Sequence, residues 1–484
     1  MRRGYLLMLL VSMFWAQAWA ETVTFVHLND IYEIQPIEGG KYGGAARVAT
    51  EIARLKKSSA PVIVTLGGDY LSPSALGTAR VDGEALGGRQ MVDVLNAIGV
   101  DWATFGNHEF DVSEAAFRHH LQQAKFRLVS SNVVGADGKP FPKVATSAIV
   151  PVKAGKRTLR IGLVGVTIDS TSKPWVAYRD AIASARAEID QLKGKVDAIV
   201  ALTHLTLAQD AEFLNALPEV DLVLGGHEHE NWLARRGENL APIVKADANV
   251  RSIAVVKLDF GKAGERPTAD VKLVSIDKRI PESAAVAARV AAWTQEGFDA
   301  FRKEGFDPQA IVATSNEPLD GRESVVRNRP GRLTDLIATA IAHEAQPVDV
   351  AFFNSGSVRI DDVLPAGPIT EYDIIRVLPF GGKIVSATFD GALLARVLEA
   401  GENNQGLGGY LQVIGAEHGP NGWLVAGKAI DPAARYRVGL DDFLLTGGEI
   451  NLGFLRRDNP QVHDLRDLRD IRRAVIDELR ATYR

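Results

Sequence analysis

Residues 102–111 read WATFGNHEFD, a short apolar run that ends in glycine and is followed by an amide, an imidazole and two carboxylates. Similar apolar, β-branched runs recur along the first half of the chain, and amphipathic stretches at 45–57 and 181–194 separate several of them. This alternation predicts an α/β domain with mostly buried strands. The other predicted strands are VTFVHL (23–28), VIVTLGG (62–68), IGLVGV (161–166), DAIVALTH (197–204) and DLVLGG (221–226).

Polar side chains follow five of these runs at the point where each run ends. A single polar residue at a strand end is usually a turn or cap residue, but five such ends together indicate a functional site. In open α/β sheets, ligands and catalytic groups gather at the carboxyl ends of the strands. We therefore expect the following side chains to lie together: Asp30, Asp69, Asn107, His108, His204, His227 and His229.

These side-chain types indicate a metal site. Carboxylate, amide and neutral imidazole without thiolate suit Mn, Zn, Fe or Mg rather than a soft metal, and the chain has no cysteine. A carboxylate such as Asp69 can bridge two cations, so the set predicts two divalent metal ions. Paired metals are a common device for hydrolysing phosphate esters, because one activates water and both hold the phosphoryl oxygens.

Five ordered motifs carry a resemblance to the calcineurin-like metallophosphoesterases. They are Asp30, GGDYLSPS (67–74), GNHEFD (106–111), LTHL (202–205) and GGHEHE (225–230). More narrowly, the chain resembles the secreted bacterial 5'-nucleotidase and UDP-sugar hydrolase family over nearly its whole length. The resemblance implies an N-terminal four-layer α/β/β/α metallophosphoesterase sandwich and a C-terminal α+β nucleotide-specificity domain.

The resemblance also implies a role for each residue of the motifs. Asp69 would bridge the two metals. His108 would not be a ligand but would stabilise the transition state and assist the leaving oxygen, and Asp111 would orient its imidazole. Glu109 is interpreted as a local hydrogen-bonding residue. One metal would be held by Asn107, His204 and His227, and the other by Asp30 and His229.

Tyr32 departs from the family pattern, whose first motif is usually Asp-x-His with both residues on one metal. Two interpretations stay open. Tyr32 ligates as a phenolate, which would favour a harder metal such as Fe(III), or it forms a pocket wall and leaves that metal short of one ligand. The ordinary phenol pKa, near 10, favours the second interpretation.

The second half of the chain has a separate organisation. Residues 279–307 predict a helix entered after Pro281, which either links two domains or packs within one. Beyond it, the segments at 332–345, 349–359, 369–391 and 436–449 predict a mixed α+β domain. The predicted limits are a metallophosphoesterase domain at 21–280, a linker helix at 281–307 and a substrate-binding domain at 308–484.

These C-terminal segments resemble the family's nucleotide-specificity domain. Asn354 and Arg359 match its Asn-x-Gly-x-x-Arg pattern, in which the arginine helps to hold the substrate phosphate. By position alone Phe380 and Phe443 would be core residues, but they match two aromatics that stack on the base. Two further candidates are less well matched: Arg327 lies near other phosphate-binding arginines, and Glu449 stands where the family usually has aspartate.

The N-terminus predicts secretion. Residues 1–20, MRRGYLLMLLVSMFWAQAWA, have a basic head, a short apolar stretch and a small-x-small end at Ala20, as in a signal peptide removed near that residue. The apolar stretch is too short for a stable membrane span. A secreted or periplasmic chain without cysteine is stabilised by its core rather than by disulfides.

The formal net charge is −5, and the chain has no long basic run, so nucleic acid is not an expected partner. No obligate protein partner is evident either. Together these features predict a secreted phosphohydrolase that releases phosphate from 5'-nucleotides or another small phosphoester. The alternatives are a cyclic-nucleotide or UDP-sugar phosphodiesterase or pyrophosphatase, and a catalytically weak nucleotide- or metal-binding protein.

Overall fold

The computed structural model describes residues 21–57, 60–420 and 422–483. The predicted signal peptide at 1–20 lies outside this part of the chain. In the described part, no helix has the length and apolar character needed to cross a membrane.

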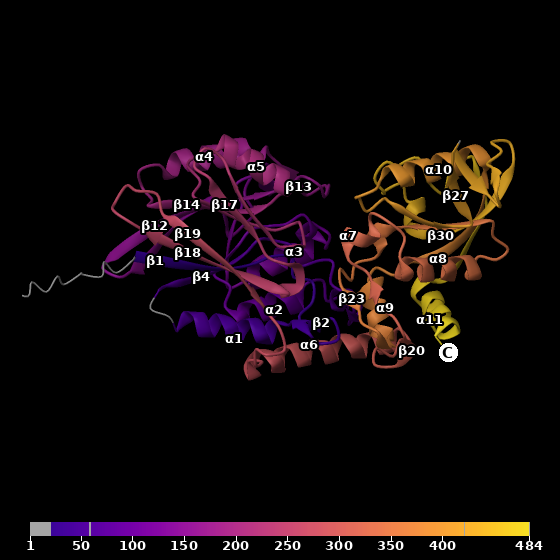
Figure 1. Cartoon of the computed structure of the whole chain (residues 1–484), viewed down its shortest axis with the longest axis horizontal. Helices are drawn as coiled ribbons and strands as arrows, with labels where there is room; N and C mark the ends of the chain where they lie inside the picture. Colours follow the sequence, from indigo (N-terminus) through magenta and orange to yellow (C-terminus); the bar gives the residue numbers. More distant parts are fainter. Residues whose placement is uncertain (1–20, 58–59, 421, 484) are drawn as a thin grey trace, which may run out of the picture.

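Two sheets stack face to face in the first half of the chain (Figure 1). The first runs in the order β10–β8–β7–β4–β1–β18–β19 and the second in the order β11–β12–β14–β15–β17–β16. β1, β4, β7 and β8 are mutually parallel, as are β12, β14, β15 and β17, so their carboxyl ends reach one edge of each sheet. The bounds in the first sheet are β10 Val144–Ala145, β8 Arg127–Val129, β7 Trp102–Ala103, β4 Val62–Leu66, β1 Glu21–Leu28, β18 Ser252–Phe260 and β19 Thr268–Ser275. Those in the second are β11 Ser147–Ala154, β12 Arg157–Thr167, β14 Ala198–His204, β15 Leu222–Gly225, β17 Ala241–Lys245 and β16 Trp232–Arg236.

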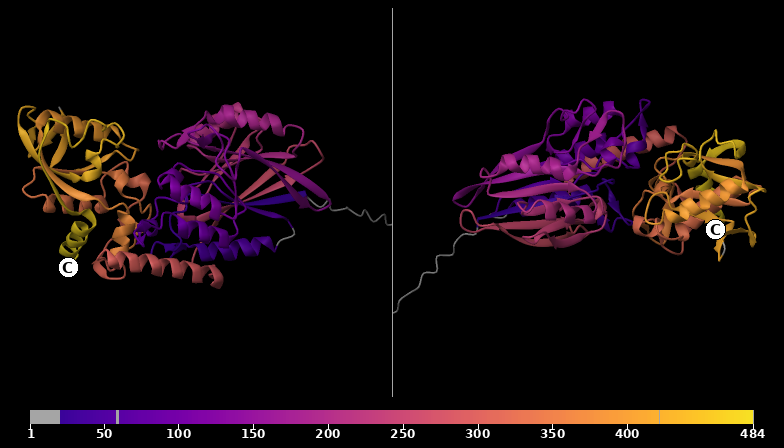
Figure 2. Two further views of the ribbon diagram at one scale, coloured as in Figure 1. Left: turned by 180° about the vertical axis from the view of Figure 1, so that it is seen from behind. Right: turned by 90° about the horizontal axis from the view of Figure 1, so that it is seen from above.

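Helices cover the outer face of each sheet (Figure 2). Phe25 of β1 packs in the core between the sheets, whereas Leu28 of the same strand packs in the core under the helices of the first sheet. A strand buried on both faces reads as a continuous apolar run, which explains the sequence pattern. The layers confirm the predicted α/β/β/α sandwich. Its helices are α1 Ala45–Lys56, α2 Arg89–Ile98 and α3 Glu114–Gln123 beside the first sheet, and α4 Ala181–Leu192 and α5 Leu207–Ala216 on the second.

The second half of the chain forms an α+β domain, as predicted. Its sheet runs in the order β26–β22–β30–β25–β31, with α10 on one face and α8 and α11 on the other. Small two-stranded antiparallel sheets, such as β21 Leu319–Asp320 with β23 Val363–Leu364, are separate from it. The main bounds are β26 Leu411–Ile414, β22 Val350–Asn354, β30 Arg435–Asp441, β25 Lys383–Asp390, β31 Val462–Asp470, α7 Glu323–Val326, α8 Arg332–Glu344, α9 Glu371–Val377, α10 Gly391–Asn403 and α11 Ile471–Thr482.

Helix α6, Ala284–Lys303, touches both halves of the molecule. It lies along α1 and α2, and near its end the ring of Phe298 packs on Tyr372 of α9 with 4.7 Å between the ring centroids. The helix therefore combines the two alternatives that the sequence left open, because it packs on the first half and contacts the second. The domain limits at 280 and 308 stay predictions.

His27 joins the two sheets at the bottom of the site. Its Nδ1 lies 3.0 Å from Thr65 Oγ1 in β4, and its Nε2 lies 2.9 Å from the carbonyl of Gly225 in β15. Its side chain is fully buried between the sheets and does not join the metal-ligand candidates. Burial lowers the pKa of His27 from 6.5 to about 4, because a charged imidazole loses its hydration there.

We expect His27 to make the fold acid-sensitive. Because the folded state holds the lower pKa, the unfolded state binds the proton first, and stability present above pH 6.5 is lost as the pH falls towards 4. The shift corresponds to about 3 kcal/mol over that window. Urea unfolding at pH 7 and pH 5 should therefore show a smaller pH dependence in His27→Gln than in the wild type. Equal pH dependence in both proteins would contradict this account.

Candidate active site

The structure brings the predicted strand-end residues together at the carboxyl edges of the two sheets. Asp30 follows β1, Asp69 follows β4, and His204 ends β14. The ligand atoms of Asp30, Asp69 and His229 lie within 4.8 Å of one another. His204 Nε2 lies 3.2 Å from Asp69 Oδ2, and the imidazole of His227 packs edge-on against His204 at 5.3 Å between centroids.

Backbone strain marks the same residues. Asp30, Asp69, His227 and His229 all have positive φ, between 51° and 84°. Residues other than glycine rarely adopt this conformation, and it persists only where surrounding contacts enforce it. Such strain concentrates at functional sites, so it supports the grouping that the sequence predicted.

Glycine at position 106 allows the Asp69 loop to come close. A Cβ at Gly106 would lie 2.0 Å from Asp69 Oδ1, so no larger residue fits without moving that carboxylate. Glu109 holds the two loops together, because its carboxylate accepts hydrogen bonds from backbone N–H groups on both. These donors are Asp69, Tyr70, Leu71 and Gly106. Glu109 is therefore a local hydrogen-bonding residue, as interpreted, and it fixes the turn that carries Asp69.

Two buried atoms in the cluster have no hydrogen-bond partner among the described residues: Asn107 Oδ1 and His204 Nε2. The contact of His204 Nε2 with Asp69 is close but lacks hydrogen-bond geometry. Its other nitrogen, Nδ1, hydrogen-bonds the carbonyl of Gly67 at 2.7 Å, which directs Nε2 into the cluster. An unpaired buried acceptor is costly unless something binds it, so these atoms fit a metal ion.

The charge of the cluster also favours cations. Burial by itself would lower the pKa of His204 and His229, but the adjoining carboxylates, Asp69 for His204 and Glu323 for His229, outweigh it and raise the values to about 9 and about 10. Burial raises the pKa of Asp30. A field that holds extra protons on imidazoles also attracts metal cations, and metal binding then displaces those protons.

The hydroxyl of Tyr32 points into the same cluster. It lies 2.9 Å from His229 Nε2, 3.2 Å from Asp69 Oδ2 and 3.4 Å from Asp30 Oδ1. Burial, reinforced by Asp69, raises the pKa of Tyr32 well above 10. The phenol is therefore more than a distant pocket wall, since it contacts three of the predicted ligands directly.

His108 and Asp111 form a close pair beside the cluster. His108 Nδ1 lies 2.6 Å from Asp111 Oδ2, and the His108 backbone N–H donates to Asp69 Oδ1 at 2.8 Å. Ser72 Oγ donates to the same Asp111 oxygen at 3.3 Å. Because Nδ1 is engaged by the carboxylate, Nε2 is the nitrogen of His108 left to meet a substrate.

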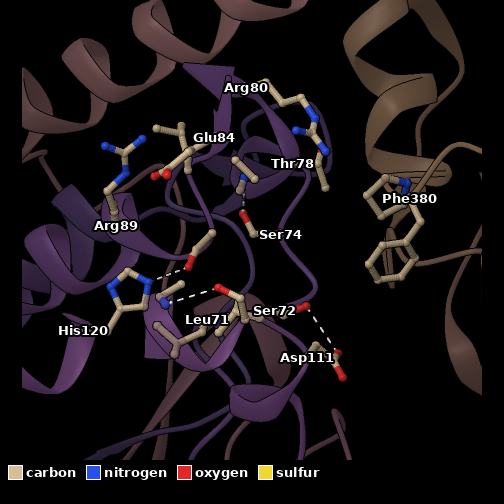
Figure 3. Close-up of a pocket in the computed structure, with 18 of the residues that line it drawn as sticks. Leu71, Ser72, Ser74, Thr78, Arg80, Glu84, Arg89, Asp111, His120 and Phe380 are labelled. Carbon is tan, nitrogen blue, oxygen red and sulfur yellow. Dashed lines mark hydrogen bonds between the residues drawn. The ribbon is translucent and has the colours of Figure 1, made fainter. Parts of the chain in front are cut away.

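A cavity of about 970 Å³ lies beside Asp111 and extends towards the second half of the chain (Figure 3). Ser72 and Asp111 line one side of it, and Phe380 faces them from the C-terminal domain. Phe380 is 57% exposed and Phe443 is 45% exposed, so neither ring is a core residue.

Two family models match the chain in sequence. The calcineurin-like phosphoesterase model matches residues 23–231, and the 5'-nucleotidase C-terminal domain model matches residues 311–454. This chain is a calcineurin-like phosphoesterase with a 5'-nucleotidase C-terminal domain. As a member of that family, it is a metal-dependent phosphoric ester hydrolase, which confirms the enzyme class predicted from the motifs.

Individual relatives agree with this assignment. A 5'-nucleotidase from Vibrio cholerae is 27% identical over 90% of this chain and 87% of its own length. The trifunctional nucleotide phosphoesterase YfkN of Bacillus subtilis is 25% identical over 88% of this chain, which spans only 32% of that longer protein. A solved 5'-nucleotidase precursor from Thermus thermophilus has the same fold, with a TM-score of 0.79, 23% identity and coverage of 96% of this chain and 97% of that one.

In the C-terminal domain of the phosphoesterase, the predicted nucleotide residues are linked by acidic side chains. Asn354 Nδ2 donates to Glu449 Oε2 at 2.6 Å. Arg327 pairs with Glu323, and Arg359 Nη1 lies 3.9 Å from the same carboxylate. The Arg359 guanidinium also lies over the Phe380 ring, 5.8 Å from its centroid.

Sequence reasoning missed several residues of this site. Lys245 is fully buried and donates from Nζ to the carbonyls of Leu205 and Gly226, which adjoin His204 and His227. Asp361 hydrogen-bonds His229 from the other domain. A lone lysine in a strand and an aspartate in a loop give no signal in sequence, because their partners lie far away along the chain.

Proposed function

We propose that the phosphoesterase releases phosphate from 5'-nucleotides at a centre of two divalent metal ions. In this proposal His108 is the general acid, and Asp111 orients its imidazole. The observation that supports this most is that the His108–Asp111 pair joins the strand-end cluster to a cavity, because the backbone N–H of His108 donates to Asp69 while Asp111 lines the cavity that Phe380 faces. The pattern of residues 1–20 supports secretion or a periplasmic location. Metal identity is left open among Mn, Zn, Mg and Fe.

Each metal would have its own ligand set. Asn107, His204 and His227 would hold one ion and Asp30 and His229 the other, with Asp69 shared between them. The unpaired atoms of Asn107 and His204 support the first set, and the close grouping of Asp30, Asp69 and His229 supports the second. When bound, a metal pair supplies an activated water and positive charge for the phosphoryl oxygens.

The protein's own groups would carry the remaining steps. Arg359 and Arg327 would hold the phosphate, and Phe380 and Phe443 would stack on the base, with Asn354 and Glu449 beside them. As water adds to phosphorus and the bond from phosphorus to the 5'-oxygen breaks, His108 Nε2 would give a proton to the departing oxygen. Asp111 would keep His108 in the required tautomer and stabilise its charged form.

In the second metal set, we propose that Tyr32 acts as a hydrogen-bonding phenol rather than as a ligand. Its hydroxyl lies within 3.4 Å of two carboxylate oxygens, one on Asp30 and one on Asp69, which is the environment of a donor. The metal beside Asp30 and His229 would then lack one ligand and bind more weakly than its neighbour.

A second candidate is hydrolysis of a larger nucleotide ester, such as a UDP-sugar or a cyclic nucleotide. The cavity favours this possibility because it extends from Asp111 to Ser74, Thr78 and Arg80, where a further polar group could bind. The third candidate function is that of a catalytically weak binding protein. The close His108–Asp111 contact argues against it, since binding alone requires no such pair.

The first test is phosphate release from 5'-AMP by metal-stripped protein reloaded with Mn, Zn, Mg or Fe. We expect metal-dependent release, and His108→Ala should lower kcat by about 10²- to 10⁴-fold because the leaving oxygen loses its acid. His343→Ala is the control, since His343 is exposed and pairs with Glu478. Absence of release with every metal, from folded wild-type protein, would refute the assignment to 5'-AMP.

The base-stacking proposal predicts a substrate-dependent effect. Phe380→Ala and Phe443→Ala should each raise KM for 5'-AMP about 10-fold, because stacking on a base contributes about 1–3 kcal/mol. KM for ribose 5-phosphate, which has no base, should not change. Equal effects on both substrates would show that the rings shape the cavity rather than recognise a base.

Tyr32 can be tested through metal affinity measured by calorimetry. Tyr32→His should tighten the weaker metal site, because a neutral imidazole ligates readily whereas a phenol must first lose its proton. Tyr32→Phe should bind both metals about as well as the wild type. Loss of one metal in Tyr32→Phe would instead identify Tyr32 as a phenolate ligand.

A further inference from the structure

His229 is held from two sides by different domains. Its Nε2 faces Tyr32 and Asp30 of the N-terminal domain, at 2.9 Å and 3.6 Å. Its Nδ1 faces the C-terminal domain, where Asp361 Oδ2 lies at 3.0 Å and Glu323 Oε2 at 3.6 Å. The imidazole therefore lies directly at the boundary between the domains.

Asp361 is fixed by more than this contact. Its second oxygen, Oδ1, accepts the backbone N–H of Glu323 at 2.9 Å, at the first residue of α7. Its side chain is 10% exposed and that of Glu323 is 16% exposed. With one oxygen on a helix start and the other on His229, the carboxylate has little freedom to turn.

Other ion pairs hold the same boundary in place. Arg376 of α9 is buried between Glu33, which lies one residue after Tyr32, and Asp362, which follows Asp361. Arg251 pairs with Glu38 and lies 3.7 Å from Asp362. These contacts position the loop that carries Asp361 against the loops that carry Asp30 and His229.

We propose that Asp361 is a positioning residue for the metal centre, supplied by the C-terminal domain, which holds His229 with Nε2 directed at the metal beside Asp30. The inference rests on the proposed role of His229 as a ligand. An imidazole that donates from Nδ1 to a carboxylate is fixed in tautomer and orientation and becomes a better ligand through Nε2. One metal site of the N-terminal domain is then complete only while the C-terminal domain is docked.

Glu323 has a lesser part in this arrangement. It is farther from His229 than Asp361 is, and one of its oxygens pairs with Arg327. The same carboxylate thus connects His229 to an arginine proposed to bind the substrate phosphate.

The test is titration of the full-length, metal-stripped protein with Mn²⁺, repeated with Zn²⁺, by calorimetry without substrate. The wild type should bind two ions. Asp361→Asn should weaken one of them by about 10- to 100-fold, the range found when carboxylate partners of ligating histidines are removed, and leave the other unchanged. Glu323→Gln should have a smaller effect in the same direction.

Asp320→Asn is the matched control. It removes the same charge from the same domain, but Asp320 contacts Arg322 rather than His229. Its metal affinities should equal those of the wild type. Thermal unfolding of each metal-free variant checks that the fold is intact.

A double variant separates positioning from a general effect of charge. In a His229→Ala background, Asp361→Asn should cause no further loss of metal affinity, because Asp361 is proposed to act on the metal only through the His229 side chain. An additional loss there, or two unchanged affinities in Asp361→Asn alone, would overturn the proposal. A wild type that binds neither ion would instead refute the proposed metal centre itself, and this inference with it.

Discussion

Asp30 and Asp69 are buried carboxylates whose ligand oxygens lie within 4.8 Å of each other, and the other side chains of the site surround this pair. Like charges buried together are costly unless cations or hydrogen-bond donors surround them. The donors here include Asn29 and the backbone N–H of His227 for Asp30, the backbone N–H of His108 for Asp69, and the hydroxyl of Tyr32 beside both. The remaining need for positive charge explains why a phosphoesterase of this fold depends on metal.

Close approach of the backbone makes this concentration of charge possible. A Cβ at Gly226 would lie 2.5 Å from the carbonyl oxygen of Gly67, so the two sheets meet at their edges only because glycine stands there. His27 and His204 then join the sheets by hydrogen bonds to the carbonyls of Gly225 and Gly67. The sandwich and the site thus share the same contacts, and a change that separates the sheets would also disperse the ligands.

The two domains meet at the metal cluster rather than away from it. Arg376 donates to Glu33 and Asp362 accepts the backbone N–H of Glu38, both in the segment that follows Asp30, and Asp361 contacts His229. A buried ion pair is costly to break from one side, because the partner is left as an unpaired buried charge. Any relative motion of the domains would therefore have to replace these contacts with water, and it would change the environment of His229.

The sequence by itself determined the α/β class of the first half and the grouping of the strand-end residues, because apolar runs of strand length alternate with helical stretches and end in polar residues. The four-layer sandwich and the His108–Asp111 pair were implied by the family resemblance rather than by these local rules. Resemblance was needed to separate Phe380 and Phe443 from core phenylalanines, because an exposed ring and a buried one look alike in an apolar run. Only the tertiary structure decided that Tyr32 reaches the ligands, that Lys245 supports the loops beside two histidines, and that Asp361 holds His229 across 132 residues of chain. Such contacts depend on how sheets and domains dock, and docking is set by packing between distant segments that no local pattern records.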